Sequence, residues 1–251
     1  MWELYDELIG GIPPEYRADL ILEGKMWTMV RSGDSCGLAM TAEGASVEDT
    51  RPRTLPAHCD GMPLRDLAVS VKSWNFAEAS LGLAAINAYW NSPEREEVAR
   101  NIAAAGDPVN VWRERAAGKK AAVIGRFSRL EEVLADVCEL SVLEKQPREG
   151  DFPDSACEYI LSSQDFVFTS GAAIINKTLP RLLELSRKTG LILIGPGVPL
   201  ASQLLKWGIL DLHGFVVTNP EICESVISGN SVYLDLFDAG KRISISGDDR
   251  R

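Results

Sequence analysis

The second half of the chain alternates short apolar runs with longer segments of mixed polarity. Several of the runs are apolar throughout, and they occupy residues 120–125, 138–144, 165–170, 190–195 and 212–218. Strands that are apolar on both sides are typical of parallel sheets whose two faces are covered by helices. The pattern therefore predicts an open α/β sheet of mostly parallel strands, with one or two edge strands within residues 231–246.

The first part of the chain has a different pattern. Residues 2–9 have the period of a short amphipathic helix, and three apolar runs with short gaps follow at 18–24, 25–32 and 35–41. Short connections between strands favour an antiparallel meander. Residues 76–90 are apolar nearly all round, which predicts a buried helix rather than a surface helix.

The few polar residues of this predicted helix form a stripe. At 100° per residue, Ser80 and Asn87 fall within about 20° of each other, and Asn91 continues the line. Buried polar groups need hydrogen-bond partners. Two interpretations stay open: a hydrogen-bonded network in the core, or one side of the helix facing a cleft.

A break between the two parts falls at Gly106-Asp107-Pro108, after a charged helix predicted at about 93–104. We therefore expect two domains, 1–106 and 107–251.

Composition narrows the classes of partner. The chain has 251 residues, 45% of them hydrophobic, and a net charge of −10. Nucleic acids and anionic membranes usually demand a basic surface, so neither partner is expected. No apolar run approaches the roughly 20 residues that span a bilayer, and the acidic start MWELYDEL does not resemble a signal peptide. We expect a cytoplasmic protein with a small-molecule ligand.

In open parallel sheets, ligands bind beyond the carboxyl ends of the strands. The first strand is followed by Gly125, Arg126 and Phe127, and then by Ser128 and Glu131 at the spacing of a capping box. This spacing predicts a helix from residue 129 whose first N–H groups face the cleft. A single glycine is not the dinucleotide-binding fingerprint, which argues against ordinary NAD binding.

The turns after the other strands add polar groups. Glu144 ends the second strand at about the distance where a Rossmann-type sheet holds a ribose hydroxyl, and Asp151 lies in the loop that follows. The densest polar cluster follows the third strand, with Thr169, Ser170 and Gly171, and then Asn176, Lys177 and Thr178; Thr178 is a candidate cap for the next helix. After the fourth strand, Gly195, Pro196 and Gly197 predict a stiff turn whose backbone can approach a ligand closely, or a tight connection without a ligand.

Metal and nucleophile motifs are weak. His58, Cys59 and Asp60 are potential ligands, but adjacent residues rarely reach one ion, so no metal site is predicted. The five cysteines show no Cys-x-x-Cys spacing, which favours reduced, mostly buried thiols. With two histidines, a Ser-His-Asp mechanism is not expected, and acid–base chemistry would fall to carboxylates or lysines.

Five strings together resemble a domain-of-unknown-function family labelled with heavy-metal chelation, over nearly the whole chain: VKSWNFAEASLGLAAINA (71–88), AAVIGRF (121–127), LEKQPREGDFPD (143–154), FTSGAAIINKTLPRLLELS (168–186) and IGPGVPLASQLLKWGILDLHG (194–214). The resemblance implies a small α+β domain like the amino-terminal domain of enolases, followed by a Rossmann-like, doubly wound domain. It implies a site between them.

By position, the resemblance places twelve residues in that site: Lys72, Ser73, Asn75, Glu78, Asn87, Gly125, Glu144, Asp151, Ser170, Gly171, Asn176 and Thr178. This chain departs from the family pattern at two turns. It has Arg126-Phe127-Ser128 where the family has His-Phe-Pro, and Pro196-Gly197-Val198-Pro199 where the family has Pro-Ser-Thr-Pro. The loss of a histidine and two hydroxyls indicates a different ligand, or binding without turnover.

Three hypotheses for function remain open. The first is an enzyme or former enzyme that condenses or hydrolyses a pterin-, flavin- or siderophore-like compound, with Glu144 and Asp151 as acid–base groups and Lys72 as a charged group. The second is a protein that binds a metal chelate or cofactor without catalysis. The third is a protein like the S-adenosylmethionine-dependent methyltransferases. The sequence names no cofactor and leaves a homo-oligomer open.

Overall fold

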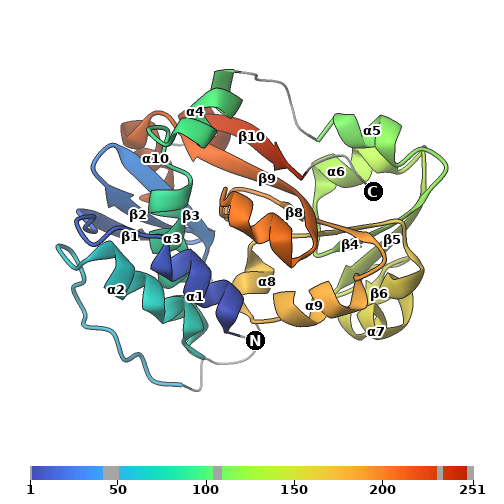
Figure 1. The fold of residues 1–251 in the computed structure, drawn as a ribbon, viewed down its shortest axis with the longest axis horizontal. Coiled ribbons are helices and arrows are strands. Elements are labelled where there is room, and N and C mark those ends of the chain that lie inside the picture. The colour runs from blue at the N-terminus through green and yellow to red at the C-terminus, as the bar shows by residue number, and fades with distance from the viewer. Residues whose placement is uncertain (1, 42–50, 104–108, 231–233, 248–251) are drawn as a thin grey trace.

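The protein is described here by a computed structural model covering residues 2–41, 51–103, 109–230 and 234–247 (Figure 1). The first segment builds a small sheet of three antiparallel strands, β1 (Leu20–Glu23), β2 (Trp27–Ser32) and β3 (Ser35–Met40). Adjacent strands pair along their whole length, with Trp27 opposite Met40 at one end and Ser32 opposite Ser35 at the other. The predicted meander is confirmed.

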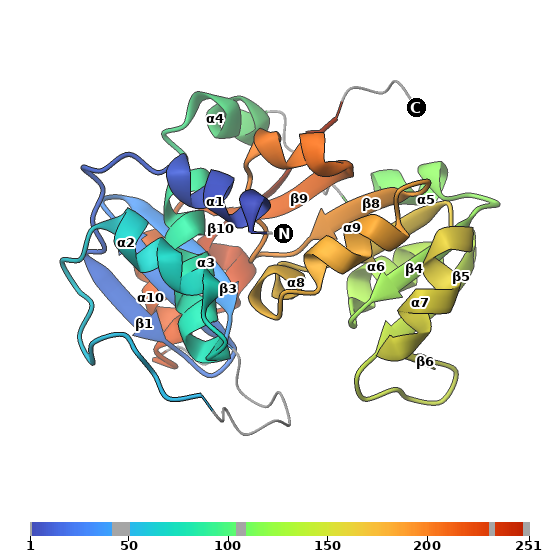
Figure 2. The ribbon, with the colours of Figure 1, turned by 60° about the horizontal axis from the view of Figure 1, so that its bottom comes forward.

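Helix α3 (Phe76–Trp90) covers one face of this sheet, with the bounds that its apolar pattern predicted. Close packing depends on Gly37 of β3, because a Cβ there would lie 2.0 Å from the backbone nitrogen of Ala88. The helices α1 (Glu3–Gly10) and α2 (Leu64–Ala68) and the 3₁₀ helix η1 (Val69–Lys72) lie beside α3 (Figure 2).

The second segment forms a seven-stranded sheet in the order β10-β9-β8-β7-β4-β5-β6. All neighbours are parallel except β10, which runs antiparallel to β9. The chain leaves β4 toward β5 and returns to its other side at β7, so the topological switch point lies beside β4. The strands are β4 (Lys120–Ile124), β5 (Glu139–Glu144), β6 (Phe152–Pro153), β7 (Phe166–Thr169), β8 (Gly190–Ile194), β9 (Ile209–Val217) and β10 (Gly240–Ser246).

Helices cover both faces of the large sheet. On one face, α5 (Val111–Arg115) and α6 (Ser128–Leu134) enclose a core around Trp112 and Phe168. The other face carries α7 (Cys157–Ile160), α8 (Ala172–Ile175), α9 (Leu179–Leu185) and the 3₁₀ helix η4 (Ser202–Trp207), and the 3₁₀ turns η2 (Asp154–Ala156) and η3 (Leu161–Ser163) flank α7. The fold class predicted from the sequence is confirmed: a small enolase N-terminal-like α+β unit and a Rossmann-like, doubly wound sheet.

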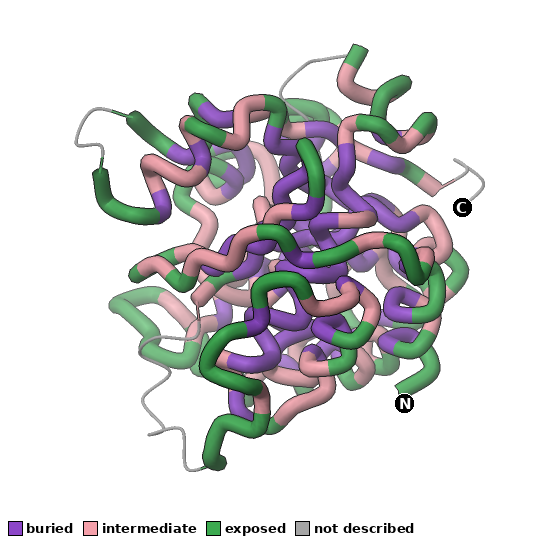
Figure 3. The backbone as a smooth tube through the Cα atoms, turned by 90° about the vertical axis from the view of Figure 1, so that its left-hand side faces the viewer, coloured by how far each residue is buried: buried purple, intermediate pink, exposed green. Residues whose placement is uncertain are grey.

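The two segments share one apolar core. A single cluster of buried residues runs from Leu8 of α1 and Ile86 of α3 to Ile174 of α8 and Leu204 of η4. Buried stretches accordingly gather in the middle of the molecule, with exposed ones around them (Figure 3). The predicted division at residues 106–107 lies outside the described segments and stays a proposal; the parts on either side of it share this core.

The carboxyl-terminal part of the chain returns to the small sheet. Helix α10 (Pro220–Ile227) and the 3₁₀ helix η5 (Leu236–Ala239) pack on the face of the small sheet opposite α3, where Cys223 and Leu236 join Met29 and Leu38 in one buried cluster. Helix α4 (Glu96–Ala103) lies against β10. No helix within the described segments is long and apolar enough to cross a membrane.

Both predicted side-chain caps are wrong. Helix α6 starts one residue earlier than expected, at Ser128, without a side-chain cap; instead the Glu131 carboxylate reaches back and accepts from the Phe127 N–H at 2.7 Å. Thr178 precedes α9 as predicted, but its hydroxyl donates to Asn176 Oδ1 at 2.7 Å rather than capping the helix. In neither case does the predicted hydroxyl accept a hydrogen bond from an N–H of the helix.

Candidate functional site

The turns after β4 and β5 are joined by an ion cluster. The guanidinium of Arg126 pairs with the Asp151 carboxylate and lies 3.0 Å from Glu131. Asp151 also accepts from the Arg148 N–H at 2.8 Å. Glu144, at the end of β5, is close enough to act on Arg126 electrostatically. Three of the predicted site residues, Arg126, Glu144 and Asp151, therefore come together.

This cluster keeps Asp151 charged. The backbone N–H of Arg148 and the guanidinium of Arg126 hold the pKa of Asp151 below its ordinary value, although desolvation opposes them. A carboxylate of lowered pKa is a hydrogen-bond acceptor at neutral pH and a poor proton donor. The contacts favour a role for Asp151 in fixing the acidic loop against the β4 turn.

The turns after β4, β7 and β8 approach one another. A Cβ on Gly171 would lie 2.1 Å from the carbonyl oxygen of Gly197, so only glycine allows this contact between the β7 and β8 turns. Gly125 and Gly195 have φ angles of +90° and +122°, which favour glycine, and the Phe127 ring lies next to both. The strand ends named from the sequence thus form one edge of the sheet.

The polar cluster after β7 satisfies itself. Thr169 is buried in the sheet, and the Ser170 hydroxyl accepts from the Ala172 N–H at 3.2 Å. Asn176 Oδ1 accepts from both the N–H and the hydroxyl of Thr178, at 3.1 and 2.7 Å. These groups shape the β7 turn, and none of them lines the pocket described next.

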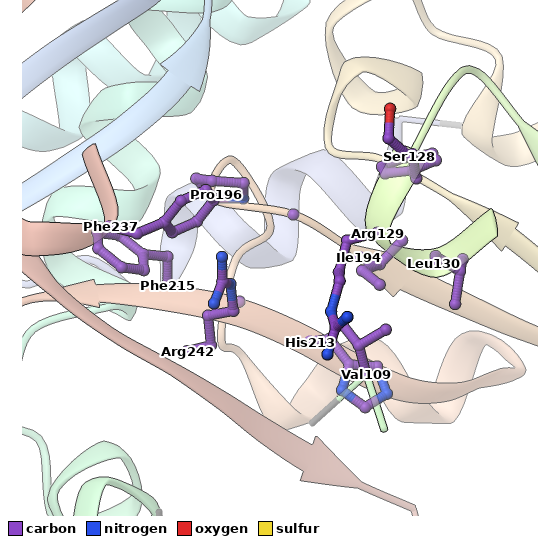
Figure 4. Close-up of a pocket in the computed structure, with 13 residues that line it drawn as sticks. Val109, Ser128, Arg129, Leu130, Ile194, Pro196, His213, Phe215, Phe237 and Arg242 are labelled. Atoms are coloured by element: carbon purple, nitrogen blue, oxygen red, sulfur yellow. The ribbon is translucent and has the colours of Figure 1, made fainter. Parts of the chain in front are cut away.

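A pocket of about 200 Å³ opens at this carboxyl edge; we call it the edge pocket (Figure 4). Figure 4 shows Pro196, Phe215 and Phe237 on one side, and Val109, Leu130 and Ile194 on the other. Of the predicted site residues, Phe127, Gly195 and Pro196 line it. The edge pocket lies wholly within the second segment, whereas the expected site lay between the two segments.

The edge pocket carries basic groups on apolar walls. Arg242 of β10 stacks on Phe237, with its guanidinium carbon 3.8 Å from the ring centre. Arg129 of α6 also lines the pocket and donates to Asn110 Oδ1 at 3.1 Å. No acidic residue is among the described residues that line the pocket, in a chain whose net charge is −10. The pocket lining is therefore basic within an acidic chain.

Sequence reasoning missed Arg242, Phe237 and His213. Arg242 and Phe237 follow the last parallel strand, and only the antiparallel return of β10 beside β9 brings Arg242 opposite Phe215. One or two edge strands were expected within residues 231–246, and the residues on the inward-facing side of such a strand were the available signal.

Buried polar contacts hold His213, which lines the edge pocket. The Trp112 indole N–H donates to His213 Nε2 at 2.9 Å, so Nε2 is the nitrogen without a proton. Asp211, only 1% exposed, accepts from Arg115 at 2.5 Å, and Arg115 in turn lies 4.1 Å above the Trp112 ring. The charge pair and the indole together fix the histidine ring.

In the first segment, Glu78 is a hydrogen-bond centre. It is fully buried and accepts from the Ser73 hydroxyl at 2.7 Å, the Leu55 N–H at 2.5 Å, and Thr54. The Asn75 side chain caps α3 by accepting from the Glu78 N–H at 3.0 Å. Desolvation alone would raise the pKa of Glu78, but these hydrogen bonds together hold it below its ordinary value. Ser73, Asn75 and Glu78 therefore anchor the loop before α2 to the start of α3.

Replacing Glu78 with glutamine is expected to destabilise the protein by about 1–3 kcal/mol at neutral pH, because one acceptor oxygen becomes a donor facing other donors. The pKa of Glu78 is lower in the folded state than in the unfolded state. The stability that the ionised Glu78 contributes is therefore fully present above the unfolded-state pKa, and it is lost as pH falls through the folded-state pKa. The difference in free energy of unfolding between wild type and E78Q should therefore narrow from about pH 6 toward about pH 3, a range that brackets the pKa values of carboxyl groups. Urea denaturation at each pH measures this difference. Glu96→Gln, at an exposed position, is the control. A difference in stability between wild type and E78Q that does not change with pH would contradict a buried, ionised Glu78.

Two other predicted site residues also have structural contacts. Lys72 forms an ion pair with Asp6 and lies 5.7 Å from the centre of the Trp2 ring. Asn87 is fully buried, and its Nδ2 donates to the Leu38 carbonyl at 2.7 Å, which fits the core-network interpretation. Asn91 of the same stripe bonds Val198 and Leu200 and fixes the β8 turn to α3.

The trio of potential metal ligands does not converge. Cys59 donates to the Pro56 carbonyl at 3.3 Å, and Asp60 accepts from the Ile21 N–H at 3.2 Å. Within the described segments, no group of three or more His, Cys, Asp or Glu side chains could hold a metal ion. Burial raises the pKa of the Cys36 and Cys223 thiols to about 12, which keeps both protonated.

The fold and the edge pocket define a two-part α/β protein with a pocket at the carboxyl edge of a Rossmann-like sheet. The chain belongs to the DUF364 family, described as "Putative heavy-metal chelation", whose family model matches residues 107–245. A second family model, DUF4213, carries the same description and matches residues 5–90. The resemblance inferred from the sequence is confirmed.

Two solved structures have the same fold as this chain. A DUF364 protein of unknown function from Desulfitobacterium hafniense is 40% identical and has a TM-score of 0.88, over 98% of this chain and 99% of that one. A second, from Pyrococcus horikoshii, is 20% identical with a TM-score of 0.77, over 97% and 98%, and shows the shared fold. No curated protein matches the chain significantly.

Proposed function

We propose that this protein binds a flat, conjugated organic anion of the pterin, flavin or siderophore kind in the edge pocket. The observation that carries the proposal is the pairing of apolar walls with the guanidinium of Arg242 in a strongly acidic chain. Arg242 makes no ion pair with a carboxylate of the described segments, so its charge is available to a ligand. A ring between Phe237 and Ile194 would be desolvated, which strengthens an anion–guanidinium contact.

The link to heavy metals would run through the ligand. The described residues offer no cluster of protein ligands for an ion. An anionic chelator, however, can carry a metal into a pocket that supplies only walls and positive charge. The family description is compatible with this way of handling a metal.

Binding is favoured over turnover by the state of the acidic groups. Asp151 and Glu131 are ion-paired to Arg126, and neither lines the edge pocket. Condensation or hydrolysis would need a proton donor or acceptor at the reacting atom, and no carboxylate is among the described residues that line the pocket. We therefore rank binding of a chelate above catalysis on it.

A thermal-shift panel tests the proposal. The probes are 6-carboxypterin, FMN and 2,3-dihydroxybenzoate, each alone and with ferric iron, together with S-adenosylmethionine. A ligand present at about 100 times its Kd should stabilise the folded state by about 2.7 kcal/mol, which is a clear rise in Tm. Arg242→Gln should weaken the responding anion about tenfold to a hundredfold, because a charged hydrogen bond is lost.

The neighbouring Lys241→Gln is the matched control, since Lys241 is exposed and adjacent on the same strand. Equal responses in R242Q and wild type would place the ligand elsewhere. A response to S-adenosylmethionine alone would replace the proposal with the methyltransferase-like alternative.

A further inference from the structure

Lys177 has an unusual backbone conformation for its residue type. It lies between α8 and α9, and its φ of +63° makes it the one non-glycine residue with positive φ among the described segments. The left-handed conformation costs an L-residue about 1–2 kcal/mol and is usually left to glycine at a helix end. The Asn176–Thr178 hydrogen bonds hold the turn in place. The contacts of the Lys177 side chain offer a reason for this unfavourable backbone conformation.

The amino group of Lys177 is held by the other segment of the chain. Nζ donates to the Ser73 carbonyl and to its own turn at the Ile175 carbonyl, each at 2.6 Å. The Trp74 and Phe76 rings lie 5.8 and 5.4 Å from Nζ. Lys177 therefore reaches across the junction between the two segments into a cup of carbonyls and aromatic rings.

No carboxylate of the described segments pairs with Lys177. The charged groups on adjoining elements are otherwise engaged: Lys72 with Asp6, and Glu78 with the loop before α2. Helix α8 carries only Ala and Ile. The cup thus lacks a counter-charge, and burial lowers the pKa of the Lys177 ammonium to about 8.

The cup suits a neutral amine. A neutral amine has two N–H bonds, and the two carbonyls accept both of them, which leaves the nitrogen lone pair directed away from the backbone. The site is accessible, because Trp74 beside it is 59% exposed and Lys177 is half-buried. An oriented lone pair on an amine of lowered pKa is the arrangement of a nucleophilic lysine.

We propose that Lys177 is a nucleophilic lysine that forms an imine with an aldehyde or ketone carried on a flat ring. The Nζ lone pair attacks the carbonyl carbon, and the carbonyl oxygen leaves as water with the two amine protons. Protonation of the imine restores one N–H for a backbone carbonyl. The exposed face of Trp74 supplies a surface on which such a ring stacks.

Reductive trapping on the full chain tests the proposal. The protein is treated with salicylaldehyde and sodium cyanoborohydride near neutral pH, and each modified lysine is quantified by peptide mass spectrometry. The neutral fraction of an amine rises about tenfold for each unit by which its pKa falls, so Lys177 should be labelled at least about tenfold faster than the exposed Lys145. The rate at Lys177 should reach half its maximum near the pKa of about 8.

Variants separate nucleophilicity from structure. Lys177→Arg keeps a donor for Ser73 but cannot form the imine, so it should abolish the fast labelling with little change in Tm. Trp74→Ala should slow the labelling of Lys177 severalfold, and Arg242→Gln should leave it unchanged, since the edge pocket is not involved. Labelling of Lys177 no faster than of Lys145, or a midpoint near that of an ordinary lysine, would overturn the proposal without affecting the proposed function.

Discussion

Replacing Gly37 with alanine is expected to destabilise the protein by at least about 3 kcal/mol, which lowers Tm by roughly 6–12 °C. The new Cβ would lie 2.0 Å from the Ala88 nitrogen and 2.1 Å from the Ala84 carbonyl oxygen, both backbone atoms of a buried helix. Neither atom can give way without moving α3 off β3. Thermal and urea unfolding followed by circular dichroism measure the effect.

Gly10→Ala is the matched control. Gly10 ends α1, and a Cβ there would meet nothing within 4 Å. Its effect should stay within about 0.5 kcal/mol. If G37A and G10A unfold at the same temperature, α3 and β3 are not packed as closely as described.

Replacing Arg115 with methionine should cost about 3 kcal/mol or more, because it leaves the buried Asp211 carboxylate without its partner. Ligand binding in the edge pocket should weaken as well, because Arg115 stacks on Trp112 and the Trp112 indole holds His213. Urea unfolding measures the first effect, and the affinity of whichever anion responds in the thermal-shift panel measures the second.

Arg113 of the same helix provides the comparison. Its guanidinium donates two hydrogen bonds to Asp136, of 2.7 Å each, but both side chains are about half exposed or more. Arg113→Met should therefore cost less than about 1 kcal/mol. The double variant Arg115→Met/Asp211→Leu should recover much of the loss, since no charge is then buried alone; a double variant as unstable as R115M would contradict the assignment.

Helix α3 shows what a local pattern predicts well. Its apolar residues predicted both its bounds and its burial, because a helix that is apolar nearly all round is buried. The parallel strands were predicted for the same reason. The caps of α6 and α9 were predicted less well, because spacing alone does not decide whether a hydroxyl turns toward the N–H groups of its helix or bonds elsewhere.

The candidate site was predicted in part. Phe127, Gly195 and Pro196 line the edge pocket because strand ends of a parallel sheet meet at one edge, which follows from sequence order. Lys177 belonged to the polar cluster noted after the third strand, but its contact with Ser73 spans 104 positions in the chain. No local pattern contains such a contact.

The sequence by itself determined the secondary structure, the fold class and the family, because each rests on the period and order of residues along the chain. Tertiary structure alone decided that both segments share one core, that α10 covers the small sheet, and that Arg242 and Phe237 complete the edge pocket. These features depend on which apolar faces meet when distant segments pack. That choice is made by the whole molecule and is not encoded in any single stretch of it.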